Sequence, residues 1–331
     1  MIVGGGPAGA YCAYDLANQG IVSAVFDHSH PREKPCGGGI SPLLVKKFPF
    51  VNQFRLGCGT FEHYKIISCT GKQVTETNLK KGFITSRRYF DQEILNMARN
   101  KGAKLFKEKI LDVQWKQDRW AIRTTKRSLS TRILIGADGV NSLVRRRIIG
   151  PIPKESLVLS YGYIATGPEK NHPVMKFLPG IPGYAWVFPR ENDASIGIAT
   201  ELGYGSKLKE LLNDFVRSYC PNIKIIDKFA ALIPSATNPE FFERPCAGDN
   251  WILLGDAAGH ADPISGGGIL YAIWGGQLAA SAIKMKDPKL FDKLWRDEYG
   301  KSLIERSKAR SAFYDPLTIE FTIALDAHKL L

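Results

Sequence analysis

The chain opens on a glycine-rich segment that strongly restricts its fold. Met1 to Gly9 reads M-I-V-G-G-G-P-A-G, and Gly4, Gly6 and Gly9 form the pattern G-x-G-x-x-G. The first glycine allows a tight turn out of a strand, the second lets backbone approach a pyrophosphate, and the third lets the next helix pack closely. Pro7 and Ala8 suit the start of that helix, whose free N–H groups attract phosphates.

A second apolar segment completes the unit. Residues 21–26 read as a strand that ends at Asp27, about 20 residues beyond the glycines, where a carboxylate can hold a ribose hydroxyl. These features predict a βαβ dinucleotide-binding unit. Its first strand, Ile2-Val3, is unusually short, so we expect that a few residues before it are missing.

The composition bounds the class of protein. A chain of 331 residues is long for one core, so we expect two interleaved domains. No apolar run reaches the roughly 18 residues of a membrane span, and the N-terminus is a nucleotide site rather than a signal peptide. We therefore expect a cytoplasmic protein. The six cysteines show no C-x-x-C or zinc spacing, so we expect reduced thiols and no metal site.

The net charge of +13 has two interpretations. It is either a solvated basic surface or a surface attracted to anionic membrane, worth roughly 1 kcal/mol per basic residue near acidic lipid. The excess lies at Arg87 and Arg88, along residues 99–109, at residues 145–147 and along residues 284–310. No motif for binding RNA or DNA accompanies it, so nucleic acid is not an expected partner.

Periodicity and turn signals predict an α/β fold with a β-rich insertion. Expected helices cover 7–18, 41–47, 88–101, 207–219, 268–285 and 288–310. Expected strands include a hairpin over 61–78, a meander over 103–130, buried strands at 132–138 and 251–255, and strands at 157–166, 174–178, 184–188 and 194–200. We assign residues 1–60, 82–155 and 236–285 to a discontinuous Rossmann-like nucleotide-binding domain, 61–81 and 156–235 to a β-rich substrate domain, and 286–331 to a C-terminal helical segment.

Two further motifs follow the glycine loop in a fixed order. They are G-A-D-G-V-N-S-L-V-R, residues 136–145, and G-D-A-A-G-H-A-D-P-I-S-G-G-G-I, residues 255–269. This order resembles the FAD-binding flavoprotein family that includes para-hydroxybenzoate hydroxylase, over about the whole chain. The resemblance implies FAD as the cofactor.

The resemblance also implies roles for particular residues. Asp256 would bind the ribityl chain, Pro263 and the glycines after it would lie beside the flavin ring, and Arg87 of R-R-Y-F-D would lie by the FAD. A helix N-cap at Asp256 and a surface arginine at Arg87 are the alternatives. The full cofactor-binding set is Gly4, Gly6, Pro7, Ala8, Gly9, Asp27, Cys36, Gly37, Arg87, Ala137, Asp138, Gly139, Gly255, Asp256, Pro263, Gly266, Gly267, Gly268 and Ile269.

The β-rich part carries a second pair of motifs. Residues 183–189 read G-Y-A-W-V-F-P, and residues 34–39 read K-P-C-G-G-G. Together they resemble the geranylgeranyl reductase family, in which Y-x-W-x-F-P lines a cavity for a prenyl chain. The matching substrate residues are Tyr184, Trp186, Phe188 and Pro189. Alternation places the three aromatic side chains on one strand face, which would also suit an ordinary sheet core.

Cys36 matches the cysteine of that family's active-site loop. With Tyr184 and Trp186 it forms the expected catalytic set, in which the thiol orders the substrate or donates a proton; a buried loop cysteine is the alternative. The chain departs from the family at Gly38, where an acidic residue is common, in the acid-free run 266–268, and in ending earlier. These departures leave the exact substrate open.

The other ionisable residues form no recognisable acid pair or metal site. We read His172 and His260 as structural or solvent-facing. We expect an FAD-dependent oxidoreductase that reduces carbon–carbon double bonds of an isoprenoid chain. The alternatives are a flavin monooxygenase or halogenase of the same fold, and a redox-relay flavoprotein without its own small substrate. No second dinucleotide fingerprint identifies the electron donor, whether NAD(P)H, ferredoxin or another.

Overall fold

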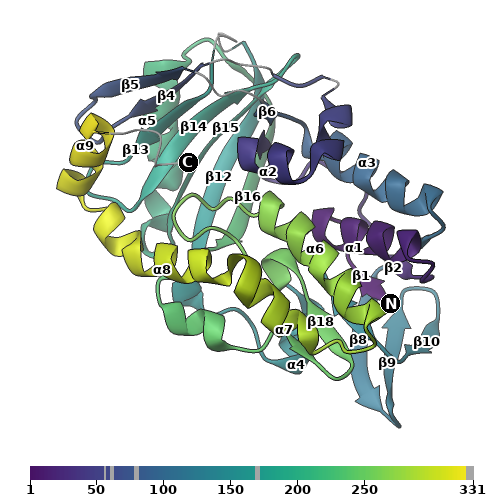
Figure 1. Cartoon of the computed structure of the whole chain (residues 1–331). Coiled ribbons are helices and arrows are strands. Elements are labelled where there is room, and N and C mark those ends of the chain that lie inside the picture. The colour runs from purple at the N-terminus through teal and green to yellow at the C-terminus, as the bar shows by residue number, and fades with distance from the viewer. Residues whose placement is uncertain (56, 60–62, 78–81, 168–171, 326–331) are drawn as a thin grey trace. The chain divides into compact units, whose positions relative to one another are not determined.

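The computed structural model describes residues 1–55, 57–59, 63–77, 82–167 and 172–325 (Figure 1). Contacts divide the chain into two compact units, each built from three segments. Unit 1 comprises Met1–Arg32, Arg88–Ser156 and Pro234–Lys308, and unit 2 comprises Glu33–Arg87, Leu157–Ile233 and Ala309–Leu331. The bounds predicted from the sequence differ most at residues 33–60, whose contacts place them in unit 2.

Unit 1 is built on a six-stranded sheet in the order β17-β18-β11-β1-β2-β7. The pairs β1–β11, β1–β2, β11–β18 and β2–β7 are parallel, and β17 runs antiparallel to β18. The carboxyl ends of the parallel strands therefore lie at one edge. The strands are β1 (Ile2–Val3), β2 (Ala24–Phe26), β7 (Lys104–Phe106), β11 (Leu134–Gly136), β17 (Ala247–Gly248) and β18 (Trp251–Leu253).

Helices and a small antiparallel sheet complete unit 1. The sheet contains β8 (Ile110–Lys116), β9 (Arg119–Thr124) and β10 (Ser128–Thr131). The helices are α1 (Pro7–Asn18), α3 (Arg87–Asn100, entered from unit 2), α4 (Leu143–Ile148), α6 (Ile269–Lys284), α7 (Leu290–Trp295) and α8 (Lys301–Phe313, continuing into unit 2). The helix predicted over 288–310 is α7 and α8 joined by a π-helical turn, Arg296–Gly300. In the part of the chain that the structure describes, no helix is both long enough and apolar enough to cross a membrane.

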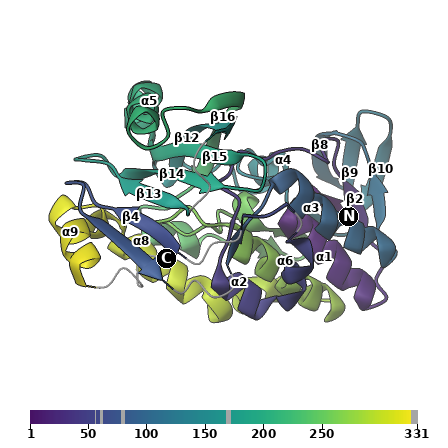
Figure 2. The same cartoon turned by 90° about the horizontal axis from the view of Figure 1, so that it is seen from above.

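Helices α1 and α6 lie side by side in both views (Figures 1 and 2). Gly276 of α6 permits this approach, because a Cβ there would come within 2.7 Å of the Ala8 carbonyl oxygen and 3.0 Å of the Cys12 nitrogen. A side chain at Gly276 would push the two helices apart.

Unit 2 contains a seven-stranded sheet in the order β16-β12-β15-β14-β13-β4-β5. Its strands are β4 (His63–Ile67), β5 (Gln73–Thr77), β12 (Leu157–Thr166), β13 (Val174–Phe177), β14 (Gly183–Pro189), β15 (Ala194–Glu201) and β16 (Lys224–Pro234). The unit also holds the two-stranded ladder of β3 (Gly39–Ile40) and β6 (Phe83–Ile84), and helices α2 (Pro42–Lys47), α5 (Leu208–Tyr219) and α9 (Pro316–Leu325). The sequence analysis does not predict β16, and α9 lies within the C-terminal helical segment that it assigns to residues 286–331.

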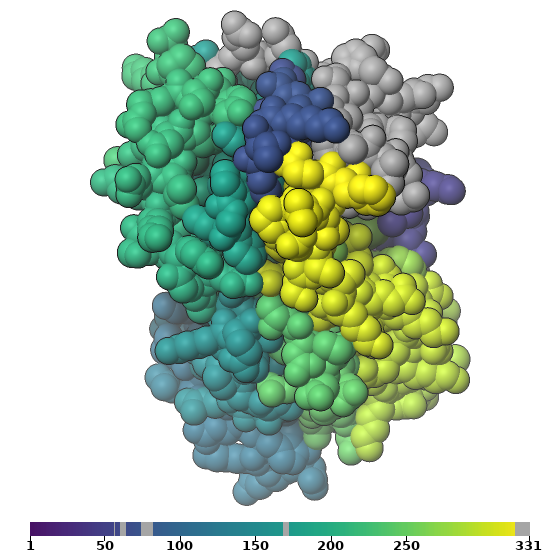
Figure 3. Space-filling view, turned by 90° about the vertical axis from the view of Figure 1, so that its left-hand side faces the viewer, coloured from purple at the N-terminus to yellow at the C-terminus, as the bar shows by residue number. Residues whose placement is uncertain are grey.

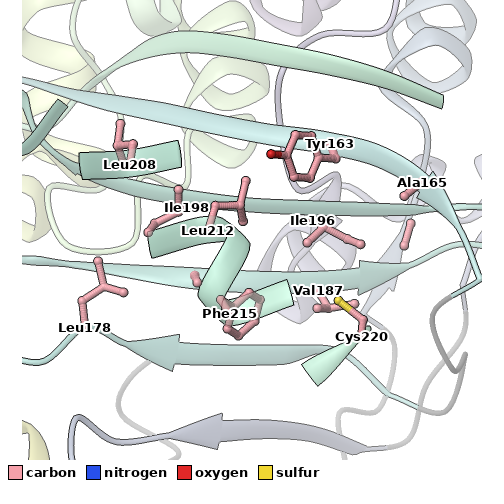
Figure 4. Packing of buried hydrophobic residues seen from close by; sticks show 12 residues of the cluster. Tyr163, Ala165, Leu178, Val187, Ile196, Ile198, Leu208, Leu212, Phe215 and Cys220 are labelled. Carbon is pink, nitrogen blue, oxygen red and sulfur yellow. The ribbon is translucent and has the colours of Figure 1, made fainter. Parts of the chain in front are cut away.

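The two faces of this sheet carry different cores. Figure 4 shows Leu212 and Phe215 of α5 packed over Val187, Ile196 and Ile198. The alternate side chains of the strands point to the opposite face, where α9 contributes its buried Ile319 to the cluster of Tyr64, Ile66 and Phe177. Figure 2 shows α5 and α9 on opposite sides of the sheet, and Figure 3 shows α9, in yellow, beside the blue β4–β5 hairpin.

Strand β16 forms one edge of this sheet. Most of its side chains reach solvent, and Ile225 and Ile226 are 41% and 58% exposed. The exposed charged residues Lys224, Asp227 and Lys228 flank these two isoleucines. The strand thus lacks the strict apolar–polar alternation that signals a half-buried strand.

His260, in the loop between β18 and α6, is completely buried. Its Nδ1 lies 3.0 Å from the Tyr299 hydroxyl, its Nε2 lies 3.6 Å from the Cys246 sulfur, and its ring packs 4.3 Å from the Trp295 ring centroid. Burial, reinforced by the charges of Arg296 and Arg145, lowers the pKa of His260 to about 3. His260 is therefore a neutral structural residue that anchors this loop to α7 and the π-helical turn.

The depressed pKa makes stability depend on pH. Below the ordinary pKa of 6.5, His260 is protonated in the unfolded chain, whereas in the folded chain it stays neutral down to about pH 3. The free energy of unfolding therefore falls as the pH falls through this window. Each pH unit costs about 1.4 kcal/mol. We expect His260→Gln to flatten the fall in unfolding free energy between about pH 6 and pH 4, measured by urea titration. Equal slopes for the wild type and the variant would contradict this.

Candidate cofactor and substrate sites

Two glycines of the first motif are required by the packing of unit 1 itself. Gly4 has φ +100°, and a Cβ on it would overlap the Ala137 carbonyl oxygen. A Cβ on Gly9 would overlap the Gly4 carbonyl oxygen, so helix α1 begins directly against the turn out of β1. Both positions need the absence of a side chain, whatever binds here.

Gly6 differs from its neighbours. Its φ of −66° and ψ of 179° suit any residue, and a Cβ on it would meet no atom of the described residues within 4 Å. The protein itself therefore gives no reason for a glycine at this position. The open space lies at the N-terminus of α1, where free N–H groups favour an anion, so the loop fits the pyrophosphate of a dinucleotide.

Asp27 follows β2 and fixes the shape of this loop. Its Oδ2 accepts the Gly5 N–H at 2.7 Å, and its Oδ1 accepts the Ser29 N–H at 2.7 Å and the Ser29 hydroxyl at 2.6 Å. Burial alone would raise the pKa of Asp27, but the hydrogen bonds from Ser29 and Gly5 outweigh it and lower the pKa. The residue is thus a carboxylate held beside the glycines.

The second motif closes around the N-terminus of α4. The Asp138 carboxylate accepts the Ser142 hydroxyl at 2.5 Å and the Leu143 N–H at 2.7 Å, so it stabilises the first turn of that helix. Ala137 lies against Gly4, and Gly139 has φ +79° in the turn. The motif therefore packs against the glycine loop through Ala137, and a direct contact of Asp138 with a cofactor stays a prediction.

The third motif follows β18 and leads into α6. Gly255 has φ +55° and packs against Ala8, and a Cβ on Gly268 would lie 3.2 Å from the Asp256 carboxylate. Gly268 is the N-cap of α6, which begins at Ile269. The Pro263 carbonyl accepts the Ser235 hydroxyl at 2.7 Å. The motif thus brings Asp256, Gly255 and the amino end of α6 next to the amino end of α1.

Two side chains that the sequence analysis does not single out hold this third motif. Asp262 accepts the N–H groups of Ile264 and Ser265 at 2.9 and 2.8 Å, which shapes the turn containing Gly266 and Gly267. The buried Arg145 guanidinium donates to the Ala257 and Ala258 carbonyls at 3.1 and 3.4 Å. Arg145 ends the second motif, so its buried charge ties the second motif to the third.

In unit 2 the residues of β14 form an aromatic row. The ring centroids of Tyr184 and Trp186 lie 5.9 Å apart, and those of Trp186 and Phe188 lie 6.4 Å apart. Trp186 is 3% exposed, whereas Tyr184 and Phe188 are half-buried. Across the ladder to β15 the row faces small residues only: Ala199, Gly197 and Ser195. Pro189 ends β14 opposite Ala194.

The loop that carries Cys36 lies on this row. A Cβ on Gly37 would come within 2.6 Å of the Phe188 ring, and the Cys36 carbonyl accepts the Ser195 hydroxyl at 3.0 Å. The Gly38 N–H donates to the Cys36 sulfur at 3.3 Å. Gly38 has φ +78°, and a Cβ there would overlap the Thr85 carbonyl oxygen. The backbone conformation at Gly38 therefore requires glycine, at the position where the family that this chain resembles often has an acidic residue.

An ion-pair network anchors the same loop. Arg190, 4% exposed, donates to Glu33 at 2.9 Å and to Asp193 at 2.5 Å. Glu33 also accepts the Ser86 hydroxyl at 2.5 Å and the Arg87 N–H at 3.1 Å. Burial would raise the pKa of Glu33, but Ser86 and the charge of Arg190 lower it. Arg87, buried at the start of α3, thus joins this network through its backbone.

The structure therefore gathers the predicted residues into two groups. The glycine loop, Asp27, Ala137 and the start of the third motif come together in unit 1. Cys36, Gly37 and the aromatic row come together in unit 2. Sequence reasoning missed Glu33, Arg190 and Ser195. A hairpin register that pairs residues 189 and 194 would have placed Ser195 beside the aromatic row.

Known proteins resemble this chain in sequence and in fold. The family described as NAD(P)-binding Rossmann-like domain matches residues 2–41. Geranylgeranyl diphosphate reductase of Rhodobacter capsulatus is 34% identical over 301 residues, which cover 85% of this chain and 74% of that protein. The crystal structure of a geranylgeranyl bacteriochlorophyll reductase-like protein of Thermoplasma acidophilum superposes with a TM-score of 0.86 at 22% identity, covering 100% of this chain and 91% of that one.

A third similarity is to a flavoenzyme with different chemistry. A triple mutant of the flavin-dependent brominase Bmp2 superposes with a TM-score of 0.80 at 18% identity, covering 98% of this chain and 92% of that one. Likeness at this level of identity concerns the fold alone, whereas the Rhodobacter relative is similar in sequence over most of both chains. The chain belongs to the geranylgeranyl reductase family of oxidoreductases.

Proposed function

We propose that the protein binds FAD in unit 1 and uses it to reduce carbon–carbon double bonds of an isoprenoid, geranylgeranyl-type chain. The observation that carries the proposal is the junction in unit 2 where the Cys36 loop packs on the aromatic row. An ordinary sheet core can contain aromatic residues, but it does not require a cysteine loop that packs on Phe188 and is hydrogen-bonded to Ser195. Membership of the geranylgeranyl reductase family supports the same substrate class.

Four features of unit 1 support FAD as the cofactor. Gly6 leaves open space at the start of α1 for a pyrophosphate, and Asp27 stands as a carboxylate beside it. Asp256 lies next to the amino end of α6, where it can accept hydroxyl hydrogen bonds of a ribityl chain. The positive end of α6 would favour an anionic reduced flavin, and the residues of the 263–268 turn would hold its ring.

The chain's own residues would orient the alkene and control its protonation. When bound, reduced FAD supplies the hydride that an alkene carbon accepts. The aromatic row offers flat apolar contact that holds a flexible polyene in place and excludes water. The Cys36 thiol, or water ordered by it, supplies the proton to the other alkene carbon.

The first prediction tests the cofactor. Gly6→Val should fold normally, because the backbone angles suit valine and a Cβ there meets no atom of the described residues within 4 Å, yet the variant should lose flavin. We expect yellow wild-type protein releasing FAD on denaturation, and largely colourless Gly6→Val and Asp256→Ala, read by absorbance and mass spectrometry. Gly203→Ala, at another position with open space, is the control that keeps flavin. Wild-type protein carrying NAD and no flavin would refute the assignment.

The second prediction tests the reaction. Trp186→Phe should retain FAD but lose about 100-fold in alkene reduction, because small misplacement at a reacting centre has effects of that order. Cys36→Ser should lose less, since a hydroxyl still orders the site. The assay is anaerobic, with dithionite-reduced enzyme and a panel of prenyl diphosphates and prenyl lipids, and it follows the gain of two hydrogens per double bond. Trp115→Phe, at an exposed tryptophan, is the matched control.

Two outcomes of this assay would overturn the proposal. Products that form only with oxygen and contain oxygen or halogen would point to a monooxygenase or halogenase. Flavin that is reduced but reoxidised only by a quinone or a protein would point to a redox relay.

We extend the proposal to contact with anionic membrane. The net charge is +13, and Leu317 and Phe321, one turn apart on α9, are 80% and 65% exposed. Basic charge with exposed apolar side chains is typical of interfacial binding. Co-sedimentation with vesicles should rise with acidic lipid, fall with salt and weaken in Leu317→Ser/Phe321→Ser, whereas Val22→Ser should bind like the wild type. Equal binding to neutral and acidic vesicles would exclude this mode.

A further inference from the structure

Ser195 connects the two halves of the candidate substrate site. Its hydroxyl accepts the Trp186 Nε1–H at 3.1 Å and donates to the Cys36 carbonyl at 3.0 Å. An indole N–H can only donate and a carbonyl oxygen can only accept, so the direction of both bonds is unambiguous. The single hydroxyl proton is committed to Cys36, and Ser195 is completely buried, so water does not compete for it.

The surroundings leave Trp186 little freedom to move. Its ring lies against Gly197, where any Cβ would overlap the indole, and it packs beside Met175 and Ala199. The indole N–H therefore points in a fixed direction. By donating to the Ser195 oxygen, it restricts the rotation of the Ser195 hydroxyl, which in turn donates to the Cys36 carbonyl. The packed Trp186 ring thus helps to fix the backbone position of the Cys36 loop through Ser195.

The loop is anchored elsewhere by other contacts. Glu33 is held by Arg190, and the Gly38 carbonyl accepts the Thr85 N–H at 2.9 Å just before the β3–β6 ladder. Loss of the Ser195 hydroxyl would therefore free only the stretch around Cys36 and Gly37, without detaching the loop. This makes Ser195 specific for the position of Cys36.

We propose that Ser195 is a positioning residue that couples Trp186 to the Cys36 backbone and so sets the place of the thiol-bearing loop on the aromatic row. The inference rests on the proposed function for its catalytic consequence, but the coupling itself is a property of unit 2. According to this proposal, the Ser195 hydroxyl aligns the two motifs predicted to handle the substrate, residues 34–39 and residues 183–189.

The coupling is tested without any substrate. In Ser195→Ala the alkylation rate of Cys36 by iodoacetamide should rise about fivefold to tenfold relative to Cys58, the change expected from losing one buried hydrogen bond. Peptide mass spectrometry measures both thiols in the same flavin-loaded sample. Trp186→Phe, which lacks the N–H, should give a similar rise, and the double variant should add little to either. Ser160→Ala, at a buried serine of β12, is the control.

The indole gives an independent readout. With ¹⁵N-labelled tryptophan, hydrogen exchange of the Trp186 indole should accelerate in Ser195→Ala, with its signal assigned from the Trp186→Phe spectrum. Ser195→Thr, which restores a hydroxyl, should return both the exchange and the alkylation rates toward wild type. Additive effects in the double variant, or unchanged rates in Ser195→Ala, would overturn the coupling.

The catalytic consequence separates the inference from the proposed function. Ser195→Ala should lower kcat for alkene reduction about tenfold with little change in KM, because the chain still binds the aromatic row while the thiol is misplaced. An unchanged kcat alongside altered thiol and indole rates would make Ser195 structural only and overturn its positioning role. If wild-type enzyme reduces no alkene, the proposed function and this catalytic role both fall, and the thiol and indole rates still decide the coupling.

Discussion

Unit 1 depends on close backbone contacts that only glycine permits. Gly4 and Gly9 bring the turn after β1, the Ala137 carbonyl and the start of α1 together without side chains between them. Gly276 does the same for α1 and α6. These contacts keep the amino ends of both helices at the carboxyl edge of the sheet, the edge at which Rossmann-like folds bind their ligands.

In unit 2 as well, small residues allow close packing, here of aromatic side chains. Across one strand pair, three aromatic side chains of β14 face Ala199, Gly197 and Ser195 of β15. The small residues leave room for the rings, and the Ser195 hydroxyl among them bonds both to the Trp186 indole and to the Cys36 carbonyl. Size complementarity thus sets where the rings lie, and Ser195 and Arg190 then set where the Cys36 loop lies.

Much of this could be predicted from local sequence. Helix α1 begins at Pro7 and ends at Asn18, as predicted, because a glycine turn and a proline define its start. The fold class and the family also followed from ordered motifs. The bonds of Ser195 could not be predicted, since they join residues 36, 186 and 195, which only the strand register brings together. The π-helical turn at 296–300 leaves no local signal, and β16 shows no alternation because it lies at an edge.

The edge position of β16 has a consequence for self-association. A long edge strand presents backbone donors and acceptors that another chain can extend into a continuous sheet, and exposed isoleucines such as Ile225 and Ile226 would favour that. Lys224, Asp227 and Lys228 place charges along the same strand, and an added strand would have to desolvate them. The charges therefore act as gatekeepers, and removing them would promote aggregation while leaving the fold intact.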